Sequence, residues 1–186
     1  MNVTGAPLSG LVIVQPKAFD DTRGFFLETW NAATYARAGI DVNFVQDNLS
    51  RSCRGTIRGL HFQSPGAQGK LVYVLDGEVW DVVVDVRGNS PTFGQWYAIT
   101  LSAHNKVQMY VPPGFAHGFC VTSEVALFAY KCTALYRAEC EHVIRWDDSE
   151  LAIPWPARDA VISDKDRSGI CLRALPSHLF DSITEK

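Results

Sequence analysis

Two strand-like runs that flank an Asp76-Gly77 pair constrain the fold of this chain more than any other feature. The runs Lys70 to Leu75 and Glu78 to Val86 are dominated by Val, Leu, Tyr and Trp, most of which favour strands. Asp-Gly is a preferred two-residue turn between antiparallel strands, so the pattern predicts a tight hairpin. Because side chains alternate along a strand, one face of the second run carries Glu78, Trp80, Val82, Val84 and Val86, and the other carries Val79, Asp81, Val83 and Asp85.

Several further short strands are expected, separated by clusters of Gly, Pro, Asn and Ser. They cover Gln95 to Leu101, Val107 to Val111 and Ala126 to Lys131, after a shorter apolar run from Leu11 to Val14. Regularly spaced turns between short strands indicate an antiparallel sandwich or barrel, and no βαβ alternation is present. We therefore predict an all-β fold, best described as a double-sheet jelly roll with short peripheral helices.

The clearest helix signal lies near the N-terminus. Asn31 can cap a helix that runs through Ala38, and Gly39 can supply the left-handed residue that ends it. A second short helix is expected after Ser177, at the end of a proline-containing tail that we expect to lie over the barrel. No linker, repeat or low-complexity tract divides the sequence, so we predict one domain over residues 1–186.

Composition excludes several broad classes of protein. A net charge of −3 argues against general affinity for nucleic acid. The five cysteines are odd in number and form no Cys-x-x-Cys pair, so we predict reduced, mostly buried thiols. There is no N-terminal signal pattern and no run of about 18 apolar residues. These observations predict a cytoplasmic protein that spans no membrane.

Two histidines stand in unusual surroundings. In Arg58-Gly59-Leu60-His61-Phe62-Gln63, His61 and Gln63 would share a polar strand face, whereas the direction of Arg58 is left open. His117 lies between prolines and glycines, which predicts either a rigid loop that holds an imidazole among aromatic residues or a hydrogen-bonded histidine in the core. The other histidines, in polar contexts, are expected at the surface: His104, His142 and His178.

The residues around His61 argue against a metal site. Jelly rolls of the cupin type often hold a divalent ion with His-x-His, a carboxylate and a later histidine. Here Gln63 replaces the second histidine, and the following loop carries Gln68 and Lys70 in place of a clear carboxylate ligand. A lysine ammonium would repel a divalent cation, so we expect chemistry without a metal.

Proton transfer is the chemistry that the remaining polar groups fit. A neutral imidazole can take a proton, a carboxylate can orient the imidazole, and a phenol can return a proton. Tyr130 and Tyr136 are the phenol candidates, although Tyr130 could equally be a core tyrosine. The orienting carboxylate could be Asp81, Asp85 or one from the run Ser163 to Arg167, which is more typical of a solvated loop.

An ordered series of motifs covers nearly the whole chain. It comprises Asp21-x-Arg23-Gly24-x-Phe26-x-Glu28, Val45-Gln46-Asp47-Asn48-x-Ser50, Arg58-Gly59-Leu60-His61-Phe62-Gln63, Gln68-x-Lys70-Leu71, Asp81-Val82-x-Val84-Asp85-x-Arg87, Ser90-Pro91-Thr92-Phe93-Gly94, Pro113-Gly114-Phe115-Ala116-His117-Gly118-Phe119 and Ser163-x-Lys165-Asp166. Each motif is weak alone, but in this order they resemble the dTDP-4-dehydrorhamnose 3,5-epimerases, which are metal-independent cupin jelly rolls. One departure is Tyr136-Arg137-Ala138, where relatives carry Tyr-x-Pro.

The resemblance implies a role for each matching residue. His61 would be the base, oriented by Asp166, and Tyr130 would be the acid. Lys70 and His117 would surround the ketone side of the sugar, with Asp81 supporting His117. The residues implied to bind the nucleotide sugar are Arg23, Phe26, Glu28, Gln46, Asn48, Arg58, Tyr136 and Lys165. No cofactor is implied, and a homodimer is expected in which Arg23 serves the neighbouring subunit.

The implied reaction inverts C3 and C5 of dTDP-4-dehydro-6-deoxyglucose to give dTDP-4-dehydro-L-rhamnose, in dTDP-L-rhamnose biosynthesis for lipopolysaccharide. An alternative is an epimerase that inverts one centre of another TDP-4-keto-6-deoxy sugar. A second alternative is a cupin that binds a sugar nucleotide without catalysis, which would not need His61, Tyr130 and Asp166 together. A metal-dependent oxygenase or isomerase is the third.

Overall fold

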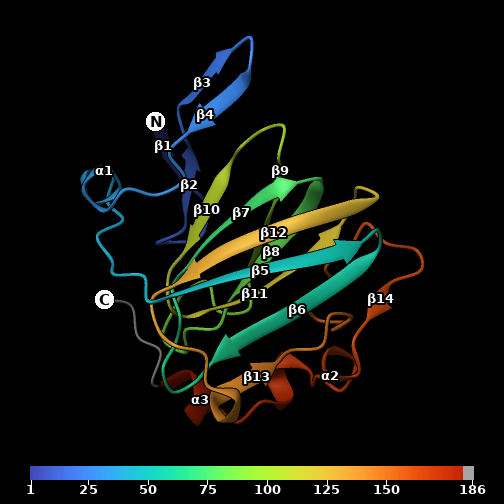
Figure 1. Cartoon of the computed structure of the whole chain (residues 1–186). Helices are drawn as coiled ribbons and strands as arrows, with labels where there is room; N and C mark the ends of the chain where they lie inside the picture. Colours follow the sequence, from blue (N-terminus) through green and yellow to red (C-terminus); the bar gives the residue numbers. More distant parts are fainter. Residues whose placement is uncertain (182–186) are drawn as a thin grey trace.

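The computed structural model describes residues 1–181 and consists mainly of two facing antiparallel sheets (Figure 1). The first sheet has the strand order β1 (Asn2–Gly5), β2 (Val12–Gln15), β10 (Gln108–Val111), β7 (Lys70–Asp76), β12 (Val125–Cys132) and β5 (Gln46–Cys53). The second has the order β13 (Glu141–Val143), β6 (Thr56–Gln63), β11 (Phe115–Val121), β8 (Glu78–Asp85) and β9 (Trp96–Ser102), with β14 (Val161–Ile162) parallel to β6. The prediction of an all-β jelly roll is confirmed.

Smaller elements surround the two sheets. Strands β3 (Ala18–Asp21) and β4 (Gly24–Leu27) form a separate hairpin that projects from the barrel (Figure 1). The helices are α1 (Ala32–Arg37), α2 (Asp164–Arg167) and α3 (His178–Asp181), and the 3₁₀ helices cover Ala138–Cys140 and Leu172–Ala174. Within residues 1–181, no helix has the length and apolar character needed to cross a bilayer.

The predicted hairpin at Asp76-Gly77 is wrong. Strand β7 pairs with β10 and β12, whereas β8 pairs with β9 and β11, so the chain passes from one sheet to the other at this turn. Gly77 has φ of 78°, and a Cβ atom there would lie 2.0 Å from the carbonyl oxygen of Val125. An Asp-Gly pair indicates that the chain reverses tightly, but it does not indicate that the two strands on either side of the turn pair with each other.

The helix prediction near the N-terminus is confirmed. The Asn31 side-chain oxygen accepts a hydrogen bond of 3.1 Å from the backbone N–H of Thr34, as expected of an N-cap. Gly39 follows with φ of 90°, the left-handed conformation that ends many helices. The short helix expected after Ser177 is also present as α3.

Two strands appear where turns or loops were expected. Strand β5 carries the polar stretch around Asn48, and β11 carries His117, which therefore does not lie in a loop. Every residue of β11 is buried, because both faces of this inner strand are covered. Phe115 and Phe119 belong to the cluster between the sheets, and Ala116 belongs to the cluster on the outer face. His142 is also not a surface residue: it lies half-buried in β13 and donates a hydrogen bond of 3.1 Å to the carbonyl oxygen of Ser64.

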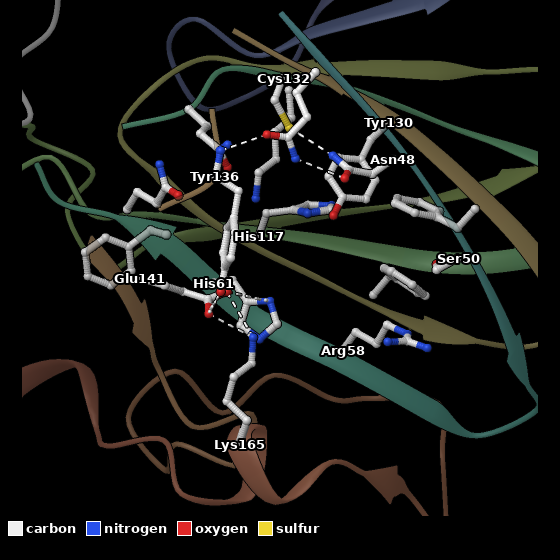
Figure 2. A pocket seen from close by; sticks show the side chains of 17 residues that line it. Asn48, Ser50, Arg58, His61, His117, Tyr130, Cys132, Tyr136, Glu141 and Lys165 are labelled. Carbon is white, nitrogen blue, oxygen red and sulfur yellow. Dashed lines mark hydrogen bonds and ion pairs between the residues drawn. The ribbon is translucent and has the colours of Figure 1, made fainter. Parts of the chain in front are cut away.

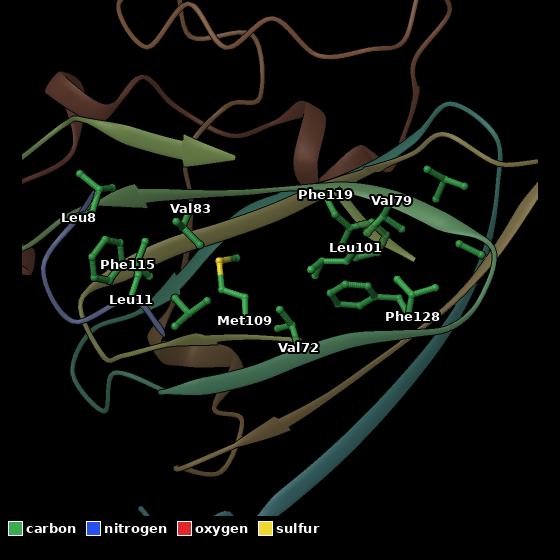
Figure 3. Close-up of a cluster of buried hydrophobic side chains, with 14 residues drawn as sticks. Leu8, Leu11, Val72, Val79, Val83, Leu101, Met109, Phe115, Phe119 and Phe128 are labelled. Atoms are coloured by element: carbon green, nitrogen blue, oxygen red, sulfur yellow. The ribbon is translucent and has the colours of Figure 1, made fainter. Parts of the chain in front are cut away.

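The alternation predicted for the second run is confirmed by its packing. Val79 and Val83 belong to the hydrophobic cluster between the two sheets (Figure 3). Val82 and Val84 point the other way, into a second cluster that the C-terminal tail covers with residues such as Phe180. The tail therefore seals the outer face of the second sheet. All five cysteines are free, and Cys120, Cys132 and Cys140 are buried, as predicted.

Replacing Gly77 with alanine should destabilise the fold far more than the same change at Gly39. Both glycines have positive φ, but a Cβ at Gly39 meets nothing within 4 Å, whereas one at Gly77 would overlap a backbone carbonyl. We expect Gly39→Ala to cost about 1 kcal/mol and Gly77→Ala at least about 3 kcal/mol. Urea unfolding of both variants measures this, and equal losses would contradict the proposed steric cause.

Candidate active site

A pocket of about 330 Å³ opens between the two sheets at one end of the barrel (Figure 2). One wall comes from β5, β7 and β12, the other from β6 and β11, and β13 and α2 lie at its rim. Most of the residues that line it are polar or aromatic. They are Gln46, Asn48, Ser50, Arg58, His61, Phe62, Gln63, Gln68, Lys70, His117, Phe119, Phe128, Tyr130, Cys132, Tyr136, Glu141 and Lys165.

A bulge in β6 brings Arg58 onto the same face as His61. His61 pairs with His117, and Arg58 pairs with Phe119. Between these two pairs, β6 therefore contains one more residue than β11, which is a β-bulge. In a regular strand, residues three apart point to opposite faces, and the extra residue restores them to one face. The direction of Arg58, left open by the sequence, is into the pocket. Its Nε donates a hydrogen bond of 3.0 Å to the Ser52 hydroxyl.

Glycine is required at the bulge. Gly59 has φ of 129°, and a Cβ there would lie 2.5 Å from Cα of Gly118. A Cβ at Gly118 would in turn lie 2.7 Å from the carbonyl oxygen of Arg58. The two strands therefore approach more closely than any residue with a side chain allows, and this close approach holds His61 and His117 side by side in the register.

His61 is paired with a buried carboxylate. Its Nε2 lies 2.5 Å from Oδ1 of Asp166, which is 2% exposed. Burial alone would raise the pKa of Asp166, but hydrogen bonds from His61, the Gly59 N–H and Ser163, together with the charge of His61, outweigh it and hold that pKa below its usual value. The run Ser163 to Arg167 is therefore not a solvated loop: Ser163 caps α2, and the helix aims Asp166 at the imidazole.

His117 has a carboxylate partner of its own. Its Nε2 lies 2.9 and 3.0 Å from the two oxygens of Asp81, which is completely buried on β8. Burial raises the pKa of Asp81 despite the neighbouring His117 and Lys70. The other candidate carboxylate, Asp85, lies outside the pocket, where it accepts hydrogen bonds from Arg87, Ser90 and Thr92.

Lys70 and Tyr130 lie on neighbouring strands of the first sheet, whereas His61 lies on the second sheet, and all three line the pocket. Figure 2 shows Tyr130 and His61 on different walls of the pocket. Burial lowers the pKa of Lys70, because an ammonium loses its hydration there. Burial likewise raises the pKa of the Tyr130 phenol. The Lys70 Nζ lies 6.0 Å from the centroid of the Tyr130 ring. A lysine amine and a phenol thus face the imidazole from the opposite sheet.

Glu141 organises the rim of the pocket and was missed by the sequence analysis. The Tyr136 hydroxyl donates a hydrogen bond of 2.9 Å to it, and the Lys165 Nζ lies 2.9 and 3.0 Å from its two oxygens. Burial would raise the pKa of Glu141, but Lys165, His61 and Tyr136 together lower it. The Tyr136 backbone N–H also donates to Gln46, at 2.7 Å.

Other lining residues were missed because their strands were not recognised. On β5, Gln46, Asn48 and Ser50 alternate with outward residues, so a strand assignment would have placed Ser50 in the pocket. Phe119 and Phe128 also line the pocket, although the sequence singled out neither as a site residue. For Glu141 the sequence carries no signal, because it lies in a short run of charged residues that resembles any surface turn.

The Gln63 side chain connects two loops beside the pocket through hydrogen bonds. Its amide nitrogen donates to the carbonyl oxygens of Gly66 and Leu135, at 2.9 and 3.3 Å, and its oxygen accepts from the Arg137 N–H at 2.7 Å. The side chain thereby ties together two loops. No group of three or more His, Cys, Asp or Glu side chains that could hold a metal occurs among residues 1–181.

The predicted residues Arg23, Phe26 and Glu28 do not reach this pocket. Phe26 is 70% exposed on the projecting β3–β4 hairpin, and the Arg23 guanidinium pairs with Asp21 at 2.6 Å. Glu28 follows the hairpin and accepts a hydrogen bond of 3.0 Å from the Asn31 amide. Phe19 and Phe25 are also more than half exposed, at 54% and 58%.

The jelly roll, with paired histidines, a phenol and an ammonium facing one pocket, defines a cupin-type epimerase of nucleotide-linked sugars. A family model described as dTDP-4-dehydrorhamnose 3,5-epimerase matches residues 5–174. The chain belongs to this family, as the motifs predicted.

Individual relatives are similar over nearly their whole length. The dTDP-4-dehydrorhamnose 3,5-epimerase of Pseudomonas aeruginosa is 52% identical, over 91% of this chain and 94% of that protein. The crystal structure of dTDP-6-deoxy-D-glucose-3,5-epimerase from Legionella pneumophila, in complex with dTDP-4-keto-L-rhamnose, has a TM-score of 0.94 at 48% identity, covering 100% of this chain and 98% of that one. A dTDP-4-dehydrorhamnose 3-epimerase of Streptomyces niveus is 36% identical, over 89% of this chain and 81% of that protein.

Replacing Asp166 with asparagine should lower stability in a pH-dependent way. The pKa of Asp166 is lowered by folding, so its ionised form stabilises the fold above its unfolded pKa of about 3.9, and this is lost as pH falls through the folded pKa. We expect Asp166→Asn to cost about 1–3 kcal/mol at neutral pH. The difference in free energy of unfolding between Asp166→Asn and the unmodified protein should be constant from pH 7 down to about pH 4 and should become smaller below that pH.

Urea unfolding between pH 3 and 7 tests this expectation. Asp164→Asn is the matched control, because Asp164 lies exposed on the same helix. A cost for Asp166→Asn that persists unchanged at pH 3 would show that the stabilisation does not depend on the ionised carboxylate.

Proposed function

We propose that this chain inverts C3 and C5 of dTDP-4-dehydro-6-deoxyglucose, forming dTDP-4-dehydro-L-rhamnose. The observation that carries the proposal is the position of the acid and base candidates on opposite walls of one pocket. His61 belongs to the second sheet and Tyr130 to the first. Inversion needs a proton to leave one side of a sugar ring and another to arrive at the opposite side, and two facing sheets supply that arrangement.

In the proposed reaction, the 4-keto group makes the hydrogens at C3 and C5 acidic. The imidazole of His61, oriented by Asp166, takes the proton from one carbon, and the electron pair moves onto the ketone oxygen to form an enolate. Tyr130 then donates its phenolic proton to the opposite side of that carbon while the ketone re-forms. The same sequence at the other carbon completes the double inversion.

Lys70 is proposed to stabilise the enolate oxygen. Its ammonium is costly to keep in the pocket wall, as its lowered pKa indicates. A negative charge that develops on the substrate would offset this cost, so the interaction strengthens as the enolate forms. His117, held by Asp81 at 2.9 Å, is proposed to donate a hydrogen bond on the same side of the sugar.

The nucleotide is proposed to extend from the sugar toward the remaining polar residues. Arg58 suits a phosphate, because a guanidinium binds phosphate oxygens through paired hydrogen bonds. Gln46, Asn48, Tyr136 and Lys165 are proposed to bind the rest of the nucleotide sugar. We further propose that the enzyme works in the cytoplasm, without a cofactor, and supplies dTDP-L-rhamnose synthesis for lipopolysaccharide.

Deuterium exchange tests the reaction. Incubation with dTDP-4-dehydro-6-deoxyglucose in D2O should label both C3 and C5, read by NMR. His61→Ala should reduce exchange by at least about 10²-fold while binding of TDP, measured by calorimetry, survives. Exchange at neither carbon by the unmodified protein would overturn the epimerase proposal. Normal exchange by His61→Ala would remove His61 as the base.

The same experiment separates the second candidate function. The similarity to the Streptomyces niveus 3-epimerase favours considering an enzyme that inverts a single centre. Label confined to C3 or to C5, without conversion of the other carbon, would support that candidate in place of the double epimerase.

We also propose that a homodimer completes the pocket with the partner's Arg23, Phe26 and Glu28. These three residues do not line the pocket of their own chain, and the β3–β4 hairpin exposes aromatic side chains; both observations support this assembly. A second copy that covered the hairpin would bury Phe19, Phe25 and Phe26.

A complementation experiment tests this assembly. Arg23→Ala and His61→Ala proteins should each be nearly inactive, and mixing them after mild unfolding should restore up to about a quarter of the sites, because each hybrid dimer has one complete pocket. Sedimentation should show a dimer throughout. Absence of restored activity in hybrids that sedimentation confirms would show that Arg23 acts within its own chain or not at all.

A further inference from the structure

The two ring nitrogens of His61 have different surroundings. Nε2 is occupied by Asp166 at 2.5 Å, so Nδ1 is the nitrogen that is free to accept a proton. Nδ1 lies 3.9 Å from Oε1 of Glu141. This separation exceeds a hydrogen bond but is within the reach of one bridging water or a small side-chain rotation. The base candidate therefore stands between two carboxylates, one on each nitrogen.

The pairing of β13 with β6 fixes this neighbour. Val143 pairs with His61 and Glu141 pairs with Gln63, so Glu141 is two residues along the partner strand from the position opposite His61. Residues in this diagonal relation lie on the same face of a sheet and can touch when one side chain is long. Figure 2 shows Glu141 beside the imidazole, at the rim of the pocket.

The two carboxylates differ in their access to water. The Asp166 side chain is 3% exposed and leads only into the protein, where Oδ2 accepts from the Gly59 N–H. Glu141 contacts Lys165 and Tyr136, whose exposures of 51% and 49% place them at the solvent boundary. A proton that left His61 toward Asp166 would be trapped, whereas one that left toward Glu141 would reach the surface in one further step.

A double inversion requires such an exit. The inference rests on the proposed function, in which one base serves two carbons of the same substrate. After the first inversion, the imidazole carries a proton on Nδ1 and cannot act again until that proton leaves. With the sugar filling the pocket, direct contact of Nδ1 with bulk water is restricted. Something at the rim must carry the proton away between the two inversions.

We propose that Glu141 relays this proton from His61 Nδ1 to solvent between the first and the second inversion. The Nδ1–H bond breaks, an O–H bond forms on Glu141, and the proton then passes to water at the rim. The imidazolium returns to neutral imidazole and the carboxylate returns to its anion, so the relay ends unchanged and one proton enters solvent. Tyr130, left as a phenolate by the first inversion, takes one proton from solvent.

Lys165 and Tyr136 fit the needs of such a relay. Their hydrogen bonds keep Glu141 ionised and fix its position, so it is ready to accept a proton. Because these donors favour the anion, the protonated carboxyl is short-lived and gives its proton up quickly. Glu141 can therefore pass a proton on, but it does not remain protonated.

The test is Glu141→Gln, which keeps the shape of the side chain but cannot carry the proton. With enzyme in excess over dTDP-4-dehydro-6-deoxyglucose in D2O, label should enter the first carbon at close to the normal rate. Label at the second carbon should fall about tenfold or more, and the singly inverted sugar should accumulate. Glu139→Gln is the matched control, because Glu139 is exposed, pairs with Arg137 and does not line the pocket.

Chemical rescue separates a relay from a structural role. Formate, a small carboxylate, should restore the second inversion in Glu141→Gln in proportion to its concentration, whereas chloride at the same ionic strength should not. Equal slowing of both inversions, no slowing, or slowing without formate rescue would each overturn the relay. If the unmodified protein labels neither carbon, the proposed function itself fails, a result distinct from any of these.

Discussion

The close approach of β6 and β11 at Gly59 and Gly118 is the constraint on which the site depends. At this point the two backbones come within a distance that no Cβ atom would allow. The approach accompanies the bulge in β6, and the bulge turns Arg58 into the pocket alongside His61. A regular pairing of the same strands would leave the pocket without its guanidinium.

Near that contact, His61 and His117 are each held by a hydrogen bond to a buried aspartate. Asp166 and Asp81 each lie almost fully buried behind a histidine ring, one from a short C-terminal helix and one from a central strand. Their pKa values move in opposite directions, lowered for Asp166 by several hydrogen bonds and raised for Asp81 by burial. The two carboxylate–imidazole pairs of the pocket therefore differ in their electrostatic environment. This difference agrees with their different proposed roles, in which His61 is the base and His117 donates a hydrogen bond to the sugar.

The sequence predicted the class of fold and most strands, because alternation and turn residues are local signals. It failed at Asp76-Gly77, because a local turn does not show which sheet the next strand joins. It also failed at β11, where both faces of the strand are covered and the sequence shows no alternation of polar and apolar residues. The resemblance to the epimerase family predicted that His61, Lys70 and Tyr130 share one site, and all three line the pocket. The position of Glu141 beside His61 was not predictable from the sequence, because it results from the pairing of β13 with β6.

Phe119 and Phe128 belong at once to the hydrophobic core and to the lining of the pocket. Their rings stack with centroids 4.2 Å apart, and Phe128 also stacks on His117. The floor of the pocket is therefore the upper surface of the packed interior, one ring from each sheet. Because packed interiors resist compression, the separation of the two walls is set by core side chains, and the core acts as a spacer that fixes the width available to a sugar ring.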